Sequence, residues 1–375
     1  MALKIHNSLS KQQELFEPIN GNSVGLYTCG PTVYNYPHIG NYRAYIFTDI
    51  LKRYLKYSGY NVNHVMNITD VDDKTIRDSI AQGKTLKELT EFYTKEFLKD
   101  RDALNITPPD KYTKATEYID EMVKMIEQLI DKGHAYKSPD GSVYFDIHTD
   151  PNYGKLSGFN IATLKRNADN RLKVDEYEKE NAQDFALWKA WDENDGDVFW
   201  ETSLGKGRPG WHIECSAMSI AELGENIDIH TGGVDLIFPH HENEIAQSEC
   251  ATGKSFVKYW MHNEHLMVDG KKMAKSLGNF YTLRDLIEKD VNPLAFRYWL
   301  YTAHYRTKTN FTIDAVEASG TALRRLYEAY TALGEDTGKV LKEYKEKFMK
   351  YMDDDLDTPK ALALLWDLVR DTDVS

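Results

Sequence analysis

The sequence predicts an α/β fold in which a parallel sheet, covered by helices, is interrupted by an inserted α+β subdomain and followed by a helical region. Two observations lead to this prediction. Strand, helix and strand patterns follow one another between residues 24 and 66, and a second strand-and-helix series starts near residue 226. The chain has 375 residues, enough for two or three domains. We place the parts at 1–104, 105–210, 211–310 and 311–375.

The first part carries the clearest pattern of the chain. An apolar run predicts a strand at Val24–Cys29, Gly30-Pro31 breaks it, and apolar residues at helical spacing predict a helix at Tyr42–Tyr57. Alternating residues then predict a second strand at Asn61–Met66. This βαβ order is typical of a Rossmann-like domain, which binds its ligands at the carboxyl ends of its strands.

The middle of the chain changes character. Amphipathic helices are predicted at Thr85–Leu104 and Ala115–Lys132, and hairpin signals with the turn Pro139-Asp140-Gly141 follow between Lys137 and Asn160. The segment Arg171–Glu201 is locally acidic, and we expect it to face the solvent. These patterns predict that 105–210 is a subdomain inserted into the parallel-sheet domain.

The sheet pattern resumes in the third part and gives way to helices in the fourth. A strand is predicted at Asn226–Thr231, a helix at His240–Ala251 and a further strand at Tyr259–Val268. The last part predicts three helices, at Ala315–Leu333, Val340–Met352 and Pro359–Arg370.

Composition excludes several classes of protein. The chain has 46 Lys plus Arg against 59 Asp plus Glu, and this net charge of −13 argues against non-specific nucleic-acid binding, although a local basic groove is compatible with it. No apolar run reaches the roughly 18 residues of a membrane span, so we expect a cytoplasmic protein with no membrane partner. The three cysteines, Cys29, Cys215 and Cys250, are widely spaced and indicate reduced thiols.

Two loops have the ingredients of a phosphate site. The first, His38-Ile39-Gly40-Asn41, leads into the first helix, whose N-terminal N–H groups favour anions, and Gly40 permits close approach of a ligand. The second, Gly270–Asn279, holds three lysines that can follow charge onto a departing pyrophosphate. Each loop taken alone is also compatible with an ordinary capping turn or a solvated turn.

Together the loops resemble the HIGH and KMSKS signatures of class I aminoacyl-tRNA synthetases. This chain has Asn41 in place of the second His of the first signature, and Ala274 in place of the first Ser of the second. An Asn side chain can still donate to a phosphate, and both lysines of the second signature are present. The resemblance implies four catalytic residues, namely His38, Asn41, Lys272 and Lys275, and ATP-binding roles for His38, Gly40 and Lys275.

A third group has the chemistry of a metal centre. Cys29 ends the first predicted strand, Cys215 lies in a Trp-His-Ile-Glu-Cys segment, and His240 and Glu244 share one helix face because they are four residues apart. Two thiolates, one imidazole and one carboxylate are ordinary ligands of a tetrahedral zinc ion. The simpler interpretation, two buried cysteines beside a polar helix, fits any one pair of these residues better than it fits all four.

Over nearly its whole length the chain closely resembles the cysteinyl-tRNA synthetase family, including the segments Asn67–Lys74 and Met352–Pro359. The resemblance implies that Cys29, Cys215, His240 and Glu244 hold one zinc ion per chain. It also implies an amino-acid pocket formed by Thr69, Trp211, His230 and Asp235. Members of the family continue into an anticodon-binding domain, so we expect 311–375 to be cut short before that domain.

The function implied is the activation of L-cysteine by ATP, which brings Mg²⁺, and its transfer to the 3′ end of tRNA(Cys), by a protein that we expect to be a monomer. Zinc would distinguish the cysteine thiolate from serine. Two other functions stay open: a cysteine ligase of the mycothiol type, which joins cysteine to an amino-sugar, and a zinc-stabilised binding module without catalysis. Residues near His304, Tyr305, Arg306 and Lys308 fit either a contact with the acceptor stem or a solvated loop.

Overall fold

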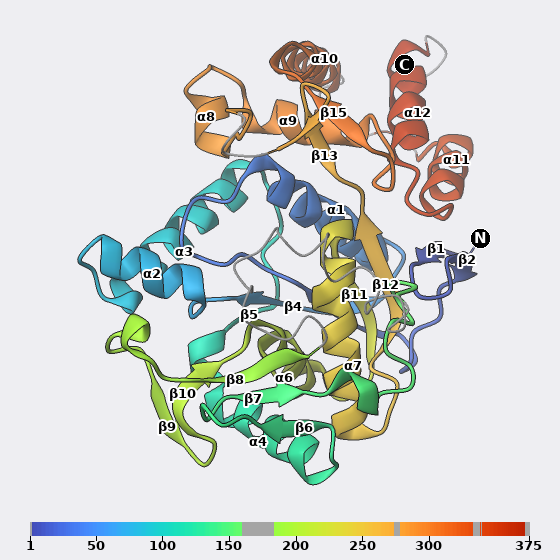
Figure 1. The fold of residues 1–375 in the computed structure, drawn as a ribbon. Coiled ribbons are helices and arrows are strands. Elements are labelled where there is room, and N and C mark those ends of the chain that lie inside the picture. The colour runs from blue at the N-terminus through green and yellow to red at the C-terminus, as the bar shows by residue number, and fades with distance from the viewer. Residues whose placement is uncertain (1, 160–183, 274–277, 333–337, 339, 372–375) are drawn as a thin grey trace.

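The computed structural model describes residues 2–159, 184–273, 278–332, 338 and 340–371, and its centre is a parallel five-stranded sheet (Figure 1). Its strands, in spatial order, are β12 (Val257–Asn263), β11 (Ile227–Gly233), β3 (Ser23–Thr28), β4 (Asn61–Ile68) and β5 (Lys111–Lys114). All four neighbouring pairs are parallel. The predicted α/β class, with a Rossmann-like parallel sheet, is therefore confirmed.

Helices cover both faces of this sheet. Helix α1 (Ile39–Tyr57) packs on one face, and α6 (Trp211–Leu223) packs on the opposite face together with α7 (Glu242–Thr252) (Figure 1). The central strands are buried between these layers, and Leu26, Tyr27 and Ile229 are fully buried. Each such side chain contributes about 1.5–3 kcal/mol by leaving water, so the site at the strand ends rests on a rigid base.

The first part of the chain also contains elements that the sequence did not predict. A short antiparallel ribbon of β1 (Lys4–Asn7) and β2 (Gln12–Leu15) precedes β3, and α2 (Asp73–Ala81) follows β4. Helix α3 (Leu86–Ala103) corresponds to the predicted Thr85–Leu104 helix. Strand β5 lies within 105–210, the range assigned to the insertion, but pairs with β4 in the parallel sheet. The division into four parts stays a prediction.

The inserted region forms a second, antiparallel sheet below the parallel one in Figure 1, packed against α4 (Ile119–Asp131). Its order is β6 (Ala135–Lys137), β7 (Val143–Phe145), β8 (Phe185–Ala190), β10 (Gly205–Pro209) and β9 (Trp200–Thr202). The β6–β7 pair confirms the predicted hairpin. The expectation that 171–201 faces the solvent is wrong for residues 185–188, which are buried in the core of this sheet, and residues 171–183 lie outside the described part.

The second half of the chain completes the sheet and then leaves it. The predicted strand at Tyr259–Val268 is two strands, because the chain bends after Asn263: β12 stays in the main sheet, whereas β13 (Leu266–Val268) joins β14 (Lys271–Lys272) and β15 (Thr309–Phe311). Helices α8 (Leu283–Ile287) and α9 (Pro293–Tyr301) lie between β14 and β15.

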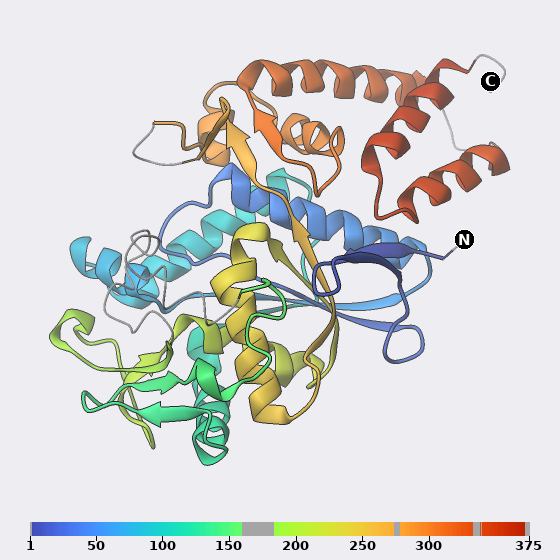
Figure 2. The same cartoon turned by 45° about the vertical axis from the view of Figure 1, so that its right-hand side comes forward.

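Three helices, α10 (Ile313–Ala332), α11 (Lys342–Met352) and α12 (Thr358–Arg370), follow β15 and match the predicted ones. Figures 1 and 2 show α11 and α12 beside the N-terminal ribbon. Within the described part of the chain, none of the helices has the length and apolar character needed to cross a bilayer.

A buried carboxylate connects the C-terminal helices to the rest of the molecule. Asp355, between α11 and α12, is 2% exposed. Its Oδ1 accepts hydrogen bonds from the backbone N–H of His6 (2.8 Å) and the Tyr305 hydroxyl (2.7 Å), and its Oδ2 accepts from Arg306 Nε (2.7 Å). The Tyr305 ring also stacks on Phe47 at 4.2 Å. This Asp355 junction gives Tyr305 and Arg306 structural partners within the protein.

Candidate active site

A cavity of about 380 Å³ opens at the carboxyl ends of β3, β11 and β12. The loop from Cys29 to Asn41 lines one side, and Trp211 and Asp235 line another. Asn263–Leu266, Met273 and Phe280 also contribute to the wall. The cavity therefore lies where a parallel sheet places its ligands, and both predicted signature loops border it.

The cavity needs a glycine directly after β3. A Cβ at Gly30 would lie 1.8 Å from the carbonyl oxygen of Asn67, so no other residue fits there without moving the backbone. The Gly30 N–H donates to Asn67 Oδ1 at 2.7 Å, and Asn67 Nδ2 donates to Thr69 Oγ1 at 3.1 Å. Residues at the end of β4 thus fix the loop that carries Cys29.

His38 and Asn41 form a reciprocal pair of hydrogen bonds that caps the N-terminus of α1. The Asn41 N–H donates to His38 Nδ1 at 3.2 Å, and the His38 N–H donates to Asn41 Oδ1 at 3.0 Å. This reciprocal capping box orients both side chains at the positive end of the helix. The helix begins at Ile39, three residues before the predicted Tyr42, because the signature loop itself forms the first turn.

The described residues on either side of the second signature loop lie at the cavity, next to the first loop. The side chain of Met273 comes within 3.1 Å of the position that a Cβ on Gly40 would occupy, and the Phe280 ring packs edge-on against His38 with centroids 5.3 Å apart. The backbone of Lys272 belongs to β14. Lys275 and Ala274 lie outside the described residues. The flanks of the predicted lysine loop are therefore at the cavity, as an ATP site requires.

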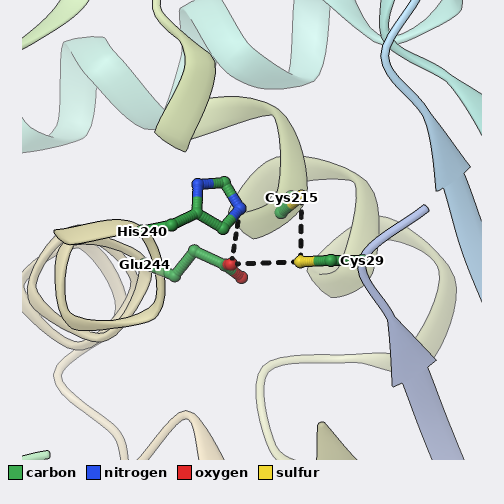
Figure 3. A group of neighbouring side chains, drawn as sticks. All are labelled: Cys29, Cys215, His240 and Glu244. Atoms are coloured by element: carbon green, nitrogen blue, oxygen red, sulfur yellow. Dashed lines mark hydrogen bonds and ion pairs between the residues drawn. The ribbon is translucent and has the colours of Figure 1, made fainter. Parts of the chain in front are cut away.

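The four predicted metal ligands meet beside the cavity, which Cys29 lines (Figure 3). One ligand atom from each of Cys29, Cys215, His240 and Glu244 lies within 4.8 Å of the others. The Cys29 and Cys215 sulfurs are 3.8 Å apart, Cys29 Sγ is 3.7 Å from Glu244 Oε1, and His240 Nε2 is 3.1 Å from the same oxygen. Figure 3 shows the four side chains pointing to a common point, from the end of β3, from α6 and from the start of α7 with the turn before it.

The pKa shifts of these four side chains show a cluster that is suited to binding a cation. The hydrogen bond from Cys29 lowers the pKa of Cys215 to about 6, whereas burial raises the pKa of Cys29 well above its usual value. Burial disfavours the charged form of His240, but the Glu244 carboxylate outweighs it and raises the His240 pKa to about 10. Shared protons therefore hold together a buried set of two sulfurs, one imidazole and one carboxylate. A Zn²⁺ ion would replace the protons on Cys29 and His240, and the residues fit that metal.

Of the four predicted residues of the amino-acid pocket, two line the cavity and two lie buried behind its wall. Trp211 and Asp235 line the cavity, and the Trp211 ring stacks on the His240 ring at 4.3 Å. Thr69 and His230 are almost fully buried behind it. Thr69 Oγ1 donates to Glu214 Oε2 at 2.8 Å, and His230 Nε2 is 3.0 Å from Glu244 Oε2. Thr69 and His230 are thus placed to orient the cavity wall and the metal cluster.

Sequence reasoning missed His241 as part of this site. Its Nε2 lies 3.4 Å from Cys29 Sγ and its Nδ1 lies 2.7 Å from His262 Nε2. Cys29, His230, His241 and Glu244 therefore form a second group whose ligand atoms lie within 4.8 Å of one another. The adjacent pair His240-His241 was the only signal in the sequence. Cys250 lies on α7 as predicted and takes part in neither group.

Two protein families match parts of this chain. Residues 15–321 match the tRNA synthetases class I (C) catalytic domain, and residues 347–374 match the DALR domain. A cysteine–tRNA ligase of Brachyspira hyodysenteriae is 51% identical over 99% of this chain and 80% of its own length. A cysteine–tRNA ligase of Chlamydia muridarum is 50% identical over the same shares.

Solved structures of other proteins share the fold of this chain. A Mycobacterium tuberculosis methionyl-tRNA synthetase in complex with methionyl-adenylate superposes with a TM-score of 0.65, covering 93% of this chain and 81% of its own, at 14% identity. A protein described as a putative arginyl-tRNA synthetase from Campylobacter jejuni has a TM-score of 0.57 at 14% identity, covering 94% of this chain and 85% of its own.

Proposed function

Because this chain belongs to the cysteine–tRNA ligases, a family of class I tRNA synthetases, we propose that it activates L-cysteine with ATP and transfers the product to tRNA(Cys). The observation that carries the proposal is the position of the buried Cys29–Cys215–His240–Glu244 cluster directly beside a cavity bordered by both phosphate-binding loops. A thiol-binding centre and an ATP site share one cavity.

The metal in this proposal is zinc, held by Cys29, Cys215, His240 and Glu244. Cysteine and serine differ only by sulfur and oxygen, and ordinary pocket contacts separate such close analogues by about 1–3 kcal/mol. When bound, zinc supplies a soft Lewis acid that prefers a thiolate to an alcohol. Trp211, stacked on the ligand His240, would keep that imidazole oriented and close the wall beside the substrate side chain.

The residues of the chain would act mainly by binding and orientation. The cysteine carboxylate attacks the α-phosphorus of ATP, so that cysteinyl-adenylate forms and pyrophosphate leaves. His38 and Asn41, fixed by their capping box, would hold the phosphates at the helix N-terminus, and Lys272 and Lys275 would stabilise the departing charge. The terminal ribose hydroxyl of the tRNA then takes the cysteinyl group and AMP leaves.

Pyrophosphate exchange tests the first step without tRNA. We expect exchange with cysteine, ATP and magnesium, and at least about tenfold less with serine, because pocket contacts alone give factors of 10 to 200 and the metal adds to them. Charging of tRNA(Cys) transcripts tests the second step. Equal exchange with serine would contradict the zinc-based selection of cysteine.

Two other outcomes are distinguishable. A cysteine ligase of the mycothiol type would form the adenylate but pass it to an amino-sugar and not to tRNA(Cys), and a binding module would show no exchange in a folded, metal-loaded preparation. The relatives at about half identity favour the tRNA reaction. A monomeric state and a cytoplasmic location stay predictions, tested by light scattering and by cell fractionation.

A further inference from the structure

Three aromatic rings form a patch that runs from the cavity to the surface. Tyr36 lines the cavity, and its ring lies edge-on to Tyr93 with centroids 5.2 Å apart and to Phe92 with centroids 6.4 Å apart. Phe92 and Tyr93 also pack edge to face at 5.1 Å. Phe92 is 43% exposed, which is high for a large apolar side chain in such a cluster. We call Tyr36, Phe92 and Tyr93 the aromatic patch.

Two cations lie over rings of this patch. The guanidinium carbon of Arg284 lies 4.4 Å from the centroid of the Tyr36 ring, and Lys84 Nζ lies 5.6 Å from that of Phe92. Lys74, which also lines the cavity, lies 5.8 Å from the neighbouring Tyr34 ring. Arg284 also pairs with Glu96 at 2.5 Å and with Asp100 at 3.4 Å, so Lys84 is the cation that remains for a phosphate. Flat apolar surfaces next to positive side chains are the features that bind unpaired bases and their phosphates.

The position of the aromatic patch identifies its occupant. For transfer, the terminal ribose of the tRNA must reach the cavity, so the unpaired nucleotides before it must cross the cavity rim. Tyr36 lies at that rim, two residues before His38, and Phe92 and Tyr93 continue from it along α3, which both ribbon views place beside α1 and the sheet (Figures 1 and 2). The patch therefore offers stacking surfaces outside the place where the adenylate must form.

We propose that the aromatic patch is a stacking platform for the single-stranded 3′ end of the tRNA, with Lys84 attracting its phosphates. The proposal rests on the proposed function and adds a binding surface to it. Stacking of one base on one aromatic ring changes affinity by roughly 5- to 150-fold. The platform predicts that loss of the outermost ring weakens tRNA binding and leaves amino-acid activation intact, because Phe92 does not line the cavity.

The test compares the full chain with its Phe92→Ala variant. We expect the KM for tRNA(Cys) to rise about 5- to 50-fold in charging, while the KM values for ATP and cysteine in pyrophosphate exchange stay within about twofold. Phe92→Trp should restore the KM for tRNA, because it restores a flat ring. Tyr327→Ala, which removes a 52% exposed aromatic side chain on α10, is the matched control and should change neither assay.

A second measurement locates the contact on the RNA. A tRNA(Cys) shortened by its unpaired 3′ nucleotides should inhibit the wild type and Phe92→Ala equally, since it lacks the bases that stack. Unchanged KM for tRNA in Phe92→Ala, a raised KM for ATP, or weaker inhibition of the variant by the shortened tRNA would each overturn the platform. If the wild type exchanges pyrophosphate but charges no tRNA(Cys), the proposed tRNA function itself is wrong, and the platform with it.

Discussion

Replacing Asp355→Asn tests whether the Asp355 junction holds the C-terminal helices in place. The carboxylate accepts on both oxygens: Oδ1 takes the His6 N–H and the Tyr305 hydroxyl, and Oδ2 takes Arg306 Nε. An amide has only one oxygen. In either orientation its NH₂ group must face at least one of these donors, so one accepted hydrogen bond is lost and two donors are brought together.

The size of the effect follows from the burial of the partners. A hydrogen bond to a charged group contributes about 1.5–3 kcal/mol, but the Arg306 side chain is 41% exposed and water can replace part of the loss. We therefore expect Asp355→Asn to lower the free energy of unfolding by about 2 kcal/mol. Asp354→Asn is the matched control. Asp354 is exposed and accepts one hydrogen bond from Gln13 at 2.9 Å, so its change should cost less than about 0.5 kcal/mol.

Urea unfolding followed by tryptophan fluorescence measures both variants. Trp366, on α12, reports on the helices next to the junction, because its Nε1 donates to the Tyr298 hydroxyl at 2.8 Å. Equal unfolding free energies for the Asp355→Asn and Asp354→Asn variants would refute the reasoning, because the exposed and the buried carboxylate would then contribute alike.

Three further predictions concern the site and the core. Cys215→Ser should lower zinc affinity by more than about a hundredfold, because loss of a ligand should exceed the 10–100-fold effect of losing an outer-shell partner. Metal analysis after dialysis measures this loss. Cys250→Ser is the control and should retain its zinc. His38→Ala should slow pyrophosphate exchange by about a hundredfold, and an unchanged rate would remove His38 from the phosphate site. Burial, with Lys52, lowers the pKa of His64 to about 3. The unfolded chain therefore binds one more proton between about pH 6.5 and 3, so stability falls as the pH drops through that window. His64→Gln should reduce this slope by up to about 1.4 kcal/mol per pH unit in urea titrations between pH 7 and 5, whereas an unaltered slope would show that His64 does not titrate this way.

The parallel sheet and the metal cluster were predictable because their signals are local or specific. The strands and helix of the first βαβ unit have clear periodicity, and the four candidate ligands lie in short segments with recognisable chemistry. Helix α6 was not predicted for a physical reason. Its residues 212–219 are all buried, so it lacks the polar face that makes a helix visible in a sequence.

Other differences come from tertiary context. Strand β5 is an edge strand that reads Lys-Tyr-Thr-Lys, with Lys111 exposed and Lys114 half-buried, so it has no apolar run from which to predict it. The buried strand β8 was not predicted, because the segment Arg171–Glu201 was judged by its total charge and the apolar residues Phe185–Trp188 are only a small part of it. The bend after Asn263 and the pairing of β13 with β15 depend on contacts between residues about 43 positions apart in the chain, for example Leu266 with Thr309, and local patterns carry no such information.

The strand order has a consequence for the synthesis of the protein. Strand β3 pairs with β11, whose residues follow about 200 positions later, so the middle of the main sheet cannot close until that part of the nascent chain has left the ribosome. The antiparallel sheet of the insertion uses strands between Ala135 and Pro209 only, so its strand pairs can form earlier, although α6 and α7 complete the core beneath it. We expect emerging chains to pair the strands of the insertion first, whereas the candidate metal cluster can assemble only after Glu244 has been synthesised.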